Sequence, residues 1–205
     1  MKDYKYKEHE YAKKIYENGF QGGHLSKELK LVAVYMKTEI GYKPAIRKQK
    51  LYEFAEKNID GYSRDIHYQI INKALNYASK KDSVLVTIPS IPIYKHEIDF
   101  INNIEILDGF SNEPYQYTKD CRKVMLALLV QIKLNHEAHR QKAGENPKGF
   151  SFGGNNTKYT NIKKMSKINV RLNIHKDIIF HLSKNGLITV LYGGIIRLDY
   201  IDKLL

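Results

Sequence analysis

The sequence predicts a predominantly helical α+β protein built from two units, each consisting of helices followed by a β-hairpin. Apolar residues recur at helical spacing in several separate segments, which indicates amphipathic helices. Two β-prone runs near the end, 187–191 and 195–201, are joined through Tyr192-Gly193-Gly194, and Gly-Gly suits a hairpin turn because primed turns need positive φ. The order of the elements is similar in the two halves, which suggests a duplication.

Composition places the chain among folded proteins. Hydrophobic residues make up 42% of the 205 residues and charged residues 27%, so a packed core is expected and disorder is not. No run of 18 apolar residues exists, and the first residues carry no apolar segment behind their charges. We therefore expect a soluble, cytoplasmic protein without a membrane partner. The single cysteine, Cys121, lies in an apolar helical run and reads as a core residue.

The N-terminal half predicts an arm and then a unit of three helices and a hairpin. The arm covers residues 1–23 and contains a short helix around 10–17. Helices follow over 25–40, ended by Gly41, and over 44–59, opened by Pro44. A third begins after Ser63 as N-cap. Its expected apolar face consists of Ile66, Ile70, Ala74, Leu75 and Ala78. Strands over 84–88 and 93–101, joined by a proline-containing turn, complete a unit spanning 24–101.

Residues 102–116 are acidic and polar with turn-forming residues, which predicts a linker. The second unit then spans 117–205. It begins with a helix from about Thr118 whose apolar residues occupy most of its circumference, so this helix should be central and nearly buried. A Gly- and Asn-rich loop over 143–157 follows. Next come a short helix around 162–168, a helix over 173–184 and the hairpin.

A short, weakly similar sequence occurs in both halves at corresponding places in this order of elements. The second strand of each predicted hairpin ends in a related tetrapeptide, Ile98-Asp99-Phe100-Ile101 in the first half and Leu198-Asp199-Tyr200-Ile201 in the second. Four residues can match by chance, so the repeated order of helices and hairpin is the better indication of duplication.

Basic residues are concentrated in the C-terminal half. The net charge is +12. Residues 117–205 carry 16 bases and 6 acids, whereas residues 102–116 carry three acids and no base. Six bases and no acid lie between Lys158 and Lys176. Such a segment favours a polyanion, because neutralising phosphates releases condensed counterions. A solvated basic face in a lysine-rich chain is the plainer alternative.

A helix-turn-helix followed directly by a two-stranded hairpin resembles the winged-helix family, and residues 160–201 (TNIKKMSKINVRLNIHKDIIFHLSKNGLITVLYGGIIRLDYI) carry the resemblance. The resemblance implies that helix 173–184 enters the major groove and that the hairpin is the wing. His175 would lie at the exposed N-terminal end of that helix. The implied DNA contacts of this unit are Lys158, Lys163, Lys164, Lys167, Arg171, Asn173, His175, Lys176, Tyr192 and Arg197.

Residues 25–101 match the same pattern less well. There the helix over 63–79 would face the groove, with contacts from Arg64, Gln69, Asn72 and Lys73. Tandem winged helices resemble replication initiators and regulators of phages and plasmids. The leading hypothesis is therefore a duplex DNA-binding protein of phage or plasmid type that acts in replication initiation or transcriptional regulation. It would need no cofactor and is not expected to be an enzyme. A homodimer and a host or phage replication protein as partner remain open.

Two other function classes remain as alternatives. Winged helices also serve as docking domains, so the chain could bind or inhibit a host protein. A metal-dependent nuclease is the third reading, although no dense carboxylate set is evident. His136 and His139 do not have zinc-site spacing and read as exposed helix-end residues. Phe150 and Phe152 could stack on single-stranded bases, but anchoring their own loop is the simpler role. Asp99 and Asp199 read as salt-bridging residues on strands.

Overall fold

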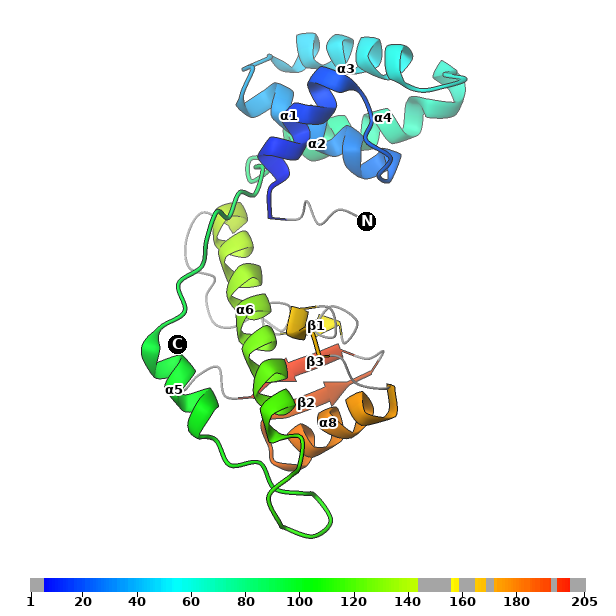
Figure 1. The fold of residues 1–205 in the computed structure, drawn as a ribbon. Helices are drawn as coiled ribbons and strands as arrows, with labels where there is room; N and C mark the ends of the chain where they lie inside the picture. Colours follow the sequence, from blue (N-terminus) through cyan, green and yellow to red (C-terminus); the bar gives the residue numbers. More distant parts are fainter. Residues whose placement is uncertain (1–5, 144–155, 159–164, 169–171, 193–194, 200–205) are drawn as a thin grey trace. The chain divides into compact units, whose positions relative to one another are not determined.

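The structure is a computed structural model that describes residues 6–143, 156–158, 165–168, 172–192 and 195–199. Within these residues the fold is predominantly helical α+β, with seven helices and three short antiparallel strands (Figure 1). The chain divides into two compact units. Unit 1 comprises Met1–Pro89 with Arg140–Asn146, and unit 2 comprises Ser90–His139 with Pro147–Leu205. The boundary therefore falls near Pro89 and not within 102–116.

Unit 1 is a bundle of four helices: α1 (Glu8–Asn18), α2 (Leu25–Thr38), α3 (Pro44–Asn58) and α4 (Arg64–Ser79). Helix α2 packs against the other three. Its residues Leu29, Val32 and Ala33 are fully buried, together with Leu51 of α3 and Ala74 of α4. The predicted helices over 10–17, 25–40, 44–59 and from 64 are thus confirmed, with small shifts at their ends. Gly41 has a φ of 76° just after α2, as a glycine that ends a helix requires.

A buried carboxylate joins α1 and α2. Glu28 is fully buried and accepts hydrogen bonds from the Tyr11 hydroxyl, from the Gln21 amide at 3.0 Å and from the Gly23 amide at 2.8 Å. These donors compensate the cost of removing the carboxylate from water. A Cβ at position 23 would lie 2.4 Å from Glu28 Oε1, so the close approach requires glycine there. This contact fixes the connection between the two helices.

The apolar face of α4 differs from the predicted one. Ile66 is 74% exposed, whereas Ile71 is fully buried with Ala74, Leu75 and Ala78. The buried positions follow the spacing i, i+3, i+4 and i+7, which defines one helix face. Ile66 lies outside that face because its position is five residues before Ile71. The prediction was therefore wrong for Ile66.

The predicted hairpin over 84–101 is wrong. Residues 84–88 are extended, but they pair through an isolated bridge between Thr87 and Lys7 and not with residues 93–101. Residues Lys95–Asn103 form a helix, α5, in place of the expected second strand. Glu97 and Ile101, one turn apart, are its buried residues. Residues 98–101 are helical whereas Leu198 ends a strand, so the two tetrapeptides do not begin in the same kind of element.

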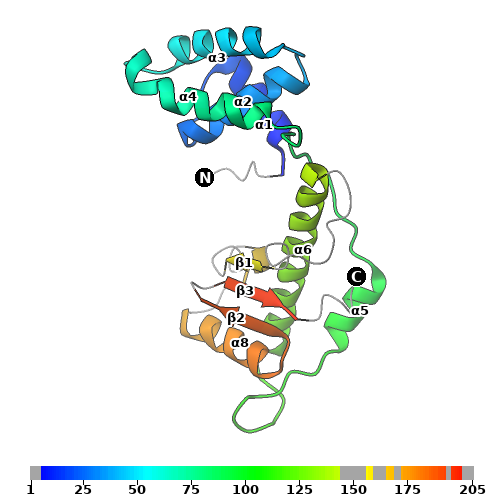
Figure 2. The same ribbon diagram turned by 180° about the vertical axis from the view of Figure 1, so that it is seen from behind.

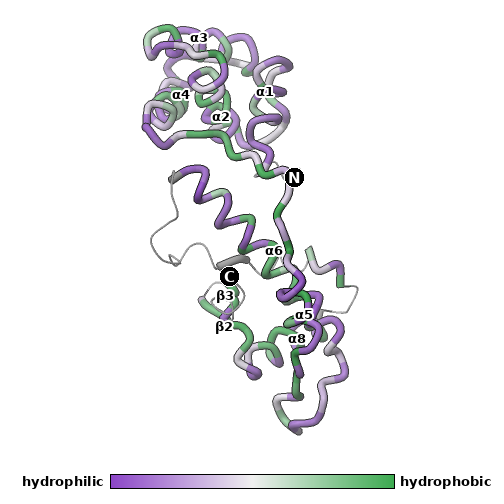
Figure 3. Tube along the Cα trace, turned by 90° about the vertical axis from the view of Figure 1, so that its left-hand side faces the viewer, coloured by the Kyte–Doolittle hydropathy of each residue, from purple (hydrophilic) through white to green (hydrophobic). Residues whose placement is uncertain are grey.

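Unit 2 is built around the long helix α6 (Thr118–Ala143). Cys121, Val124, Leu128 and Ile132 are fully buried on it, as the sequence predicted for its first half. Its N-terminal part is hydrophobic and its C-terminal end hydrophilic (Figure 3). Burial raises the pKa of the Cys121 thiol to about 12, which fits a core residue.

Among the helices that the structure describes, none is long and apolar enough to cross a bilayer.

Helix α8 (Leu172–Lys184) and a three-stranded sheet complete the core of unit 2. Strands β1 (Asn156–Lys158), β2 (Ile188–Leu191) and β3 (Ile195–Leu198) lie in the order β1-β3-β2, and each neighbouring pair is antiparallel (Figure 2). Ile196 and Leu198 on β3 are buried in the same cluster as Ile178 and Leu182 on α8. The predicted helix over 173–184 and the hairpin that follows it are confirmed within the described residues.

Residues 102–116 belong to this core and do not form a separate linker. Ile106 and Tyr115 are buried in the same cluster as α6 and α8. Their backbones are joined by a hydrogen bond of 2.9 Å from the Tyr115 amide to the Ile106 carbonyl. A further bridge pairs Leu107 with Pro114. The acidic composition that suggested a linker instead belongs to a tight loop between these two buried anchors.

A buried ion pair holds α5 against α6. Glu97 Oε1 lies 2.5 Å from Lys133 Nζ, and the two side chains are 0% and 7% exposed. Glu97 Oε2 also accepts the Tyr94 amide at 2.6 Å, and Lys133 donates to the Pro92 carbonyl at 2.9 Å. The ammonium lies 4.6 Å from the centre of the Tyr94 ring. Both charges are thus supplied with partners, which a buried pair needs to offset desolvation.

We expect Lys133→Met to destabilise the chain by about 3–5 kcal/mol, because Glu97 is then buried as an unpaired charge. The double variant Glu97→Gln with Lys133→Met should recover most of that loss, since the glutamine oxygen still accepts the Tyr94 amide. Urea denaturation measures both. Lys123→Met is the control: Lys123 forms an exposed pair with Asp120, so its loss should cost no more than about 1 kcal/mol. Equal losses in the single and double variants would contradict the role of the buried charge.

Candidate nucleic-acid interface

The N-terminal turns of α8 present polar side chains to solvent. Asn173, Lys176 and Asp177 are exposed, and their spacing of three and four residues places them on one side of the helix. Phe180 and Lys184 continue the same stripe toward the C-terminal end. The opposite side, with Ile178, Ile179 and Leu182, is buried in the core. Two of the predicted contacts, Asn173 and Lys176, are therefore accessible together.

His175 is not accessible. Its side chain is fully buried, contrary to the prediction that it lies at the exposed end of the helix. The position explains this result, because residues 175, 178, 179 and 182 share one face of a helix. His175 is therefore part of the core of unit 2, and a direct contact with a ligand from this side chain is ruled out in this conformation.

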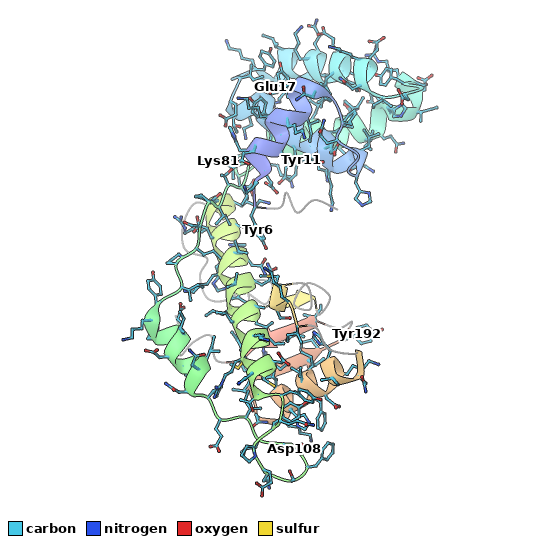
Figure 4. The ribbon with its side chains drawn as sticks, in the orientation of Figure 1. Tyr6, Tyr11, Glu17, Lys81, Asp108 and Tyr192 are labelled. Atoms are coloured by element: carbon cyan, nitrogen blue, oxygen red, sulfur yellow. The ribbon has the colours of Figure 1, made fainter. Side chains whose placement is uncertain are left out.

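The tip of the hairpin projects an aromatic side chain. Tyr192, directly after β2, is 99% exposed (Figure 4). Val190 shares the sheet face of the buried Ile188, two residues away, yet it is one of the exposed large hydrophobic residues. Since β2 runs back from the C-terminal end of α8, the tip lies toward the N-terminal end of that helix. Gly193 and Gly194 of the predicted turn lie outside the described residues.

Arg197 is held by neighbours on the sheet. Its Nε donates to Asp199 Oδ1 at 2.8 Å, and its Nη2 lies 3.2 Å from the Thr189 hydroxyl oxygen. Thr189 in turn donates to Asp199 Oδ2 at 2.7 Å. The predicted salt-bridging role of Asp199 is thereby confirmed. The charge of Arg197 is balanced locally, so this residue is a weaker candidate for a phosphate contact than Lys176. Asp99, expected on a strand, lies instead on the exposed side of α5.

Among the bases predicted to precede α8, Lys167 is the one whose side chain lies within the described residues. Lys167 is exposed, with a left-handed backbone at a φ of 51°. Lys158 is on β1, where the backbone alone is described. Lys163, Lys164 and Arg171 lie outside the described residues, as do Phe150, Phe152 and nearly all of the loop over 143–157. Lys167 and Lys176 are therefore the members of the acid-free basic segment whose side chains are described.

The C-terminal end of α8 is clamped by the loop that connects α5 to α6. The Asn185 side chain accepts the Leu107 amide at 2.9 Å and donates to the Leu107 carbonyl at 2.8 Å. His181 Nδ1 accepts the Gly109 amide at 2.9 Å. Its ring centre lies 3.9 Å from that of Tyr115, which burial keeps protonated by raising its pKa. Three polar contacts and a ring contact thus fix residues 107–109 on the helix.

The tip of this loop is ordered by Asp108. Its Oδ1 accepts the amides of Phe110 at 2.9 Å and Ser111 at 3.2 Å. The hydrogen bond from the Phe110 amide is the main reason that the pKa of Asp108 lies below its usual value, so the carboxylate is charged near neutral pH. A Cβ on Gly109 would lie 3.1 Å from Lys184 Cγ, so the backbone approaches α8 more closely than most residues permit. The name acidic loop is used below for residues 105–114.

Phe110 stands at the tip of the acidic loop. Its side chain is 82% exposed, and its ring stacks on Phe180 of α8 with centres 5.2 Å apart and planes 19° apart. Lys184 Nζ lies 5.6 Å from the centre of the Phe180 ring. The C-terminal half of the exposed stripe of α8 is therefore occupied by an aromatic pair and the loop, whereas its N-terminal half is open.

In unit 1, three of the four contacts predicted on α4 are exposed, but of these three only Gln69 and Lys73, one turn apart, share a face of the helix. Arg64, Gln69 and Lys73 are exposed on α4. Arg64 lies over the Tyr52 ring at 5.2 Å, which holds the guanidinium against α3. Asn72 is half-buried, with its Oδ1 3.4 Å from the Tyr52 hydroxyl. Asn72 therefore faces α3 and is the least suited of the four to reach a ligand.

Within the part of the chain that the structure describes, no group of three or more His, Cys, Asp or Glu side chains is arranged to hold a metal ion. His136 is half-buried and His139 exposed near the end of α6. No family model, curated protein or solved structure matches the chain. The case for a function therefore rests on the geometry and charge of the residues described above.

We expect Asn185→Ala to loosen the acidic loop, because the Leu107 amide and carbonyl lose their side-chain partner. Each lost hydrogen bond costs about 1 kcal/mol, so the loss of both corresponds to amide exchange faster by about tenfold or more. Hydrogen exchange at Leu107 and Gly109 measures this effect. Asn102→Ala, which removes an exposed amide side chain from α5, is the matched control. Unchanged exchange at Leu107 in Asn185→Ala would contradict the clamp.

Proposed function

We propose that the chain binds duplex DNA through one end of unit 2, which we call the basic end. The basic end consists of the N-terminal turns of α8, with Asn173 and Lys176, and the hairpin tip with Tyr192. The observation that carries the proposal is the coincidence of this open surface with the acid-free segment of six bases between Lys158 and Lys176. Phosphate contacts from these bases would supply most of the affinity.

The arrangement of unit 2 supports a winged-helix reading of this surface. The described order is α6, β1, a helical residue pair at 165–166, α8, β2 and β3, with the strands in the order β1-β3-β2. In winged helices the helix before the hairpin enters the major groove and the wing contacts the flanking backbone or minor groove. In this chain α8 would take the first role and Tyr192 the second. Asn173 is then the best-placed residue for a base edge, because amide side chains pair with adenine.

Only the N-terminal half of α8 is available for such a contact. Phe110 and the acidic loop occupy the C-terminal half, and the Asp108 carboxylate there would repel phosphate. The groove contact would therefore be short and would involve the first two turns of the helix. Asp177, which is exposed directly beside Lys176, shares this stripe, and its carboxylate would also repel phosphate.

The proposed role is replication initiation or transcriptional control of a phage or plasmid type, with α4 of unit 1 as a second contact. Gln69 and Lys73, one turn apart on α4, would extend the contact to neighbouring DNA. Winged-helix resemblance and charge support the DNA-binding part of this proposal. Sequencing of the genomic fragments that the chain binds would decide between these two roles. Fragments clustered at an origin would indicate replication, and fragments clustered at a promoter would indicate transcriptional control.

The affinity for duplex DNA should fall steeply with salt. A protein with several phosphate contacts loses about 10³-fold or more in affinity between about 50 and 200 mM salt, because released counterions rebind the DNA. Fluorescence anisotropy of a labelled duplex at a series of salt concentrations measures the slope. A slope near zero would exclude phosphate contacts as the source of affinity.

Charge reversal should locate the surface. Lys176→Glu is expected to weaken binding at low salt at least about tenfold, because it removes one attraction and adds one repulsion. Lys119→Glu is the matched control, since Lys119 is also exposed and lies in the first turn of α6, close in sequence to Tyr115. It should change affinity much less. A larger effect at Lys119 than at Lys176 would move the binding surface away from α8.

The N-terminal arm provides a second comparison. Charge reversal at Lys163, Lys164 and Lys167 together should weaken binding more than reversal at Lys2, Lys5 and Lys7, because the first set lies in the acid-free segment. Both triple variants change the net charge equally, so a general loss of positive charge would affect them alike. The same anisotropy measurement ranks them. The opposite ranking would place the contact in the arm.

A further inference from the structure

A pocket of about 470 Å³ lies in unit 1, beside α3 and the start of α4. This volume falls within the range of small-molecule sites. Tyr52 and Tyr62 contribute aromatic rings to the lining, and Gln49 contributes an amide. The pocket shares no residue with the basic end of unit 2, so a ligand bound there would be additional to the proposed duplex.

Charged side chains of opposite sign flank the aromatic part of the pocket along α3. Lys48, Tyr52 and Glu56 follow one another at intervals of four residues, which places them along one side of the helix. At a rise of about 1.5 Å per residue, the row extends over about 12 Å from the cation to the carboxylate. Neither Lys48 nor Glu56 forms an ion pair with another described residue. Glu53, which also lines the pocket, is paired with Lys50 at 2.7 Å.

Arg64 places a second cation over the middle of this row. Its guanidinium lies 5.2 Å from the centre of the Tyr52 ring. Arg64 is also the first residue of α4, so it lies at the positive end of that helix dipole. The Tyr62 ring lines the pocket and is held by stacking on His67, with centres 5.4 Å apart. The next residue after Arg64, Asp65, is exposed but does not line the pocket.

The order of these groups matches one class of ligand. The cations Lys48 and Arg64 suit a phosphate, and the tyrosine rings suit a planar base. The Glu56 carboxylate suits a hydrogen-bond donor at the far edge of the base, such as the amino group of cytosine. An aromatic amino acid carries its carboxylate and ammonium on one carbon, so it does not match charges at opposite ends of a row. We propose that the pocket binds one nucleotide whose base carries an exocyclic amino group.

A single nucleotide suits the pocket better than a long strand does. Among the described residues, the lining carries two cations and two carboxylates, so its charges balance. A strand requires a basic groove that follows its backbone. The pocket is also separate from the second duplex contact proposed on α4. Gln69 and Lys73 point away from it, because five residues between Arg64 and Gln69 turn the helix by about 140°.

Matched nucleotides test the proposal on the full chain. AMP and CMP are the test ligands, and IMP and UMP are their analogues with an oxygen in place of the amino group. Equilibrium dialysis should show saturable binding of AMP or CMP with a Kd below about 1 mM, as is usual for metabolite sites. The analogue of the ligand that binds should bind at least about tenfold more weakly, because its oxygen meets the Glu56 carboxylate. The nucleoside should also bind at least about tenfold more weakly, because it lacks the phosphate. Absence of saturable binding, or an analogue that binds equally well, would overturn the proposal.

Variants locate the ligand through the preference that each one removes. Glu56→Ala should abolish the preference for the amino group and keep the preference for the phosphate, whereas Lys48→Ala should do the reverse. Tyr62→Leu should weaken the binding of every ligand at least about tenfold, because stacking on the ring is lost. Lys57→Ala is the matched control and should change nothing, since nine residues place Lys57 on the side of α3 opposite to Lys48. A misfolded chain would lose both preferences together. A Glu56→Ala chain that still prefers the amino group would overturn the proposal.

Two comparisons separate the pocket from the proposed DNA contact. A single-stranded hexanucleotide of the same base should bind at most about tenfold more tightly than the mononucleotide. A larger gain that Tyr62→Leu removes would identify a strand as the ligand and overturn the proposal. Lys176→Glu should leave nucleotide binding unchanged, and Glu56→Ala should leave duplex binding unchanged. Nucleotide binding in a chain without affinity for duplex DNA would reject the proposed function alone, and the reverse result would reject the nucleotide pocket alone.

Discussion

Unit 2 depends on the burial of α6. The first half of this helix is apolar around most of its circumference, so it needs cover on several sides at once. Helix α8 and the sheet cover one side, and α5 with residues 104–117 covers another, as their shared core cluster indicates. The second of these covers is also fastened to α6 by polar contacts at two places. Lys133 pairs with Glu97 of α5, and Arg122 donates to the Ile104 carbonyl at 3.1 Å.

The burial of α6 also explains which elements the sequence predicts correctly and which it does not. Helices α2, α3, α6 and α8 carry strong apolar periodicity or clear end signals, and the hairpin has its Gly-Gly turn, so local sequence was sufficient. Residues 93–101 are rich in β-branched and aromatic residues and were assigned to a strand. They form a helix because Glu97 caps the Tyr94 amide and packs against Lys133, which is 36 positions away in the sequence. A contact at that separation leaves no local signal, whereas the glutamate three residues after Tyr94 was a local signal that was overlooked.

The candidate site was predictable in part for a similar reason. Asn173, Lys176 and Tyr192 were found because a polar helix end, a basic segment and a glycine turn are visible in the sequence. His175 was placed wrongly, although its spacing from Ile178, Ile179 and Leu182 put it on the buried face. His181 and Asn185 were missed altogether. Their partners lie 72 and 78 positions away in the sequence, so their role in holding the acidic loop is a property of the tertiary structure.

The placement of the acidic loop also bears on the DNA binding that we propose for this chain. A protein with a uniform positive charge is attracted in every orientation, and most encounters then present the wrong surface. In unit 2 Lys176 lies at the positive end of the α8 dipole, while Asp108 and Glu113 lie at the opposite end, where the acidic loop contacts His181 and Asn185. The field of a polyanion exerts a torque on such a charge distribution and turns the basic end toward the phosphates. In the proposed DNA-binding role, the acids would therefore weaken the total attraction but would increase the fraction of encounters in which the N-terminal turns of α8 meet the groove first.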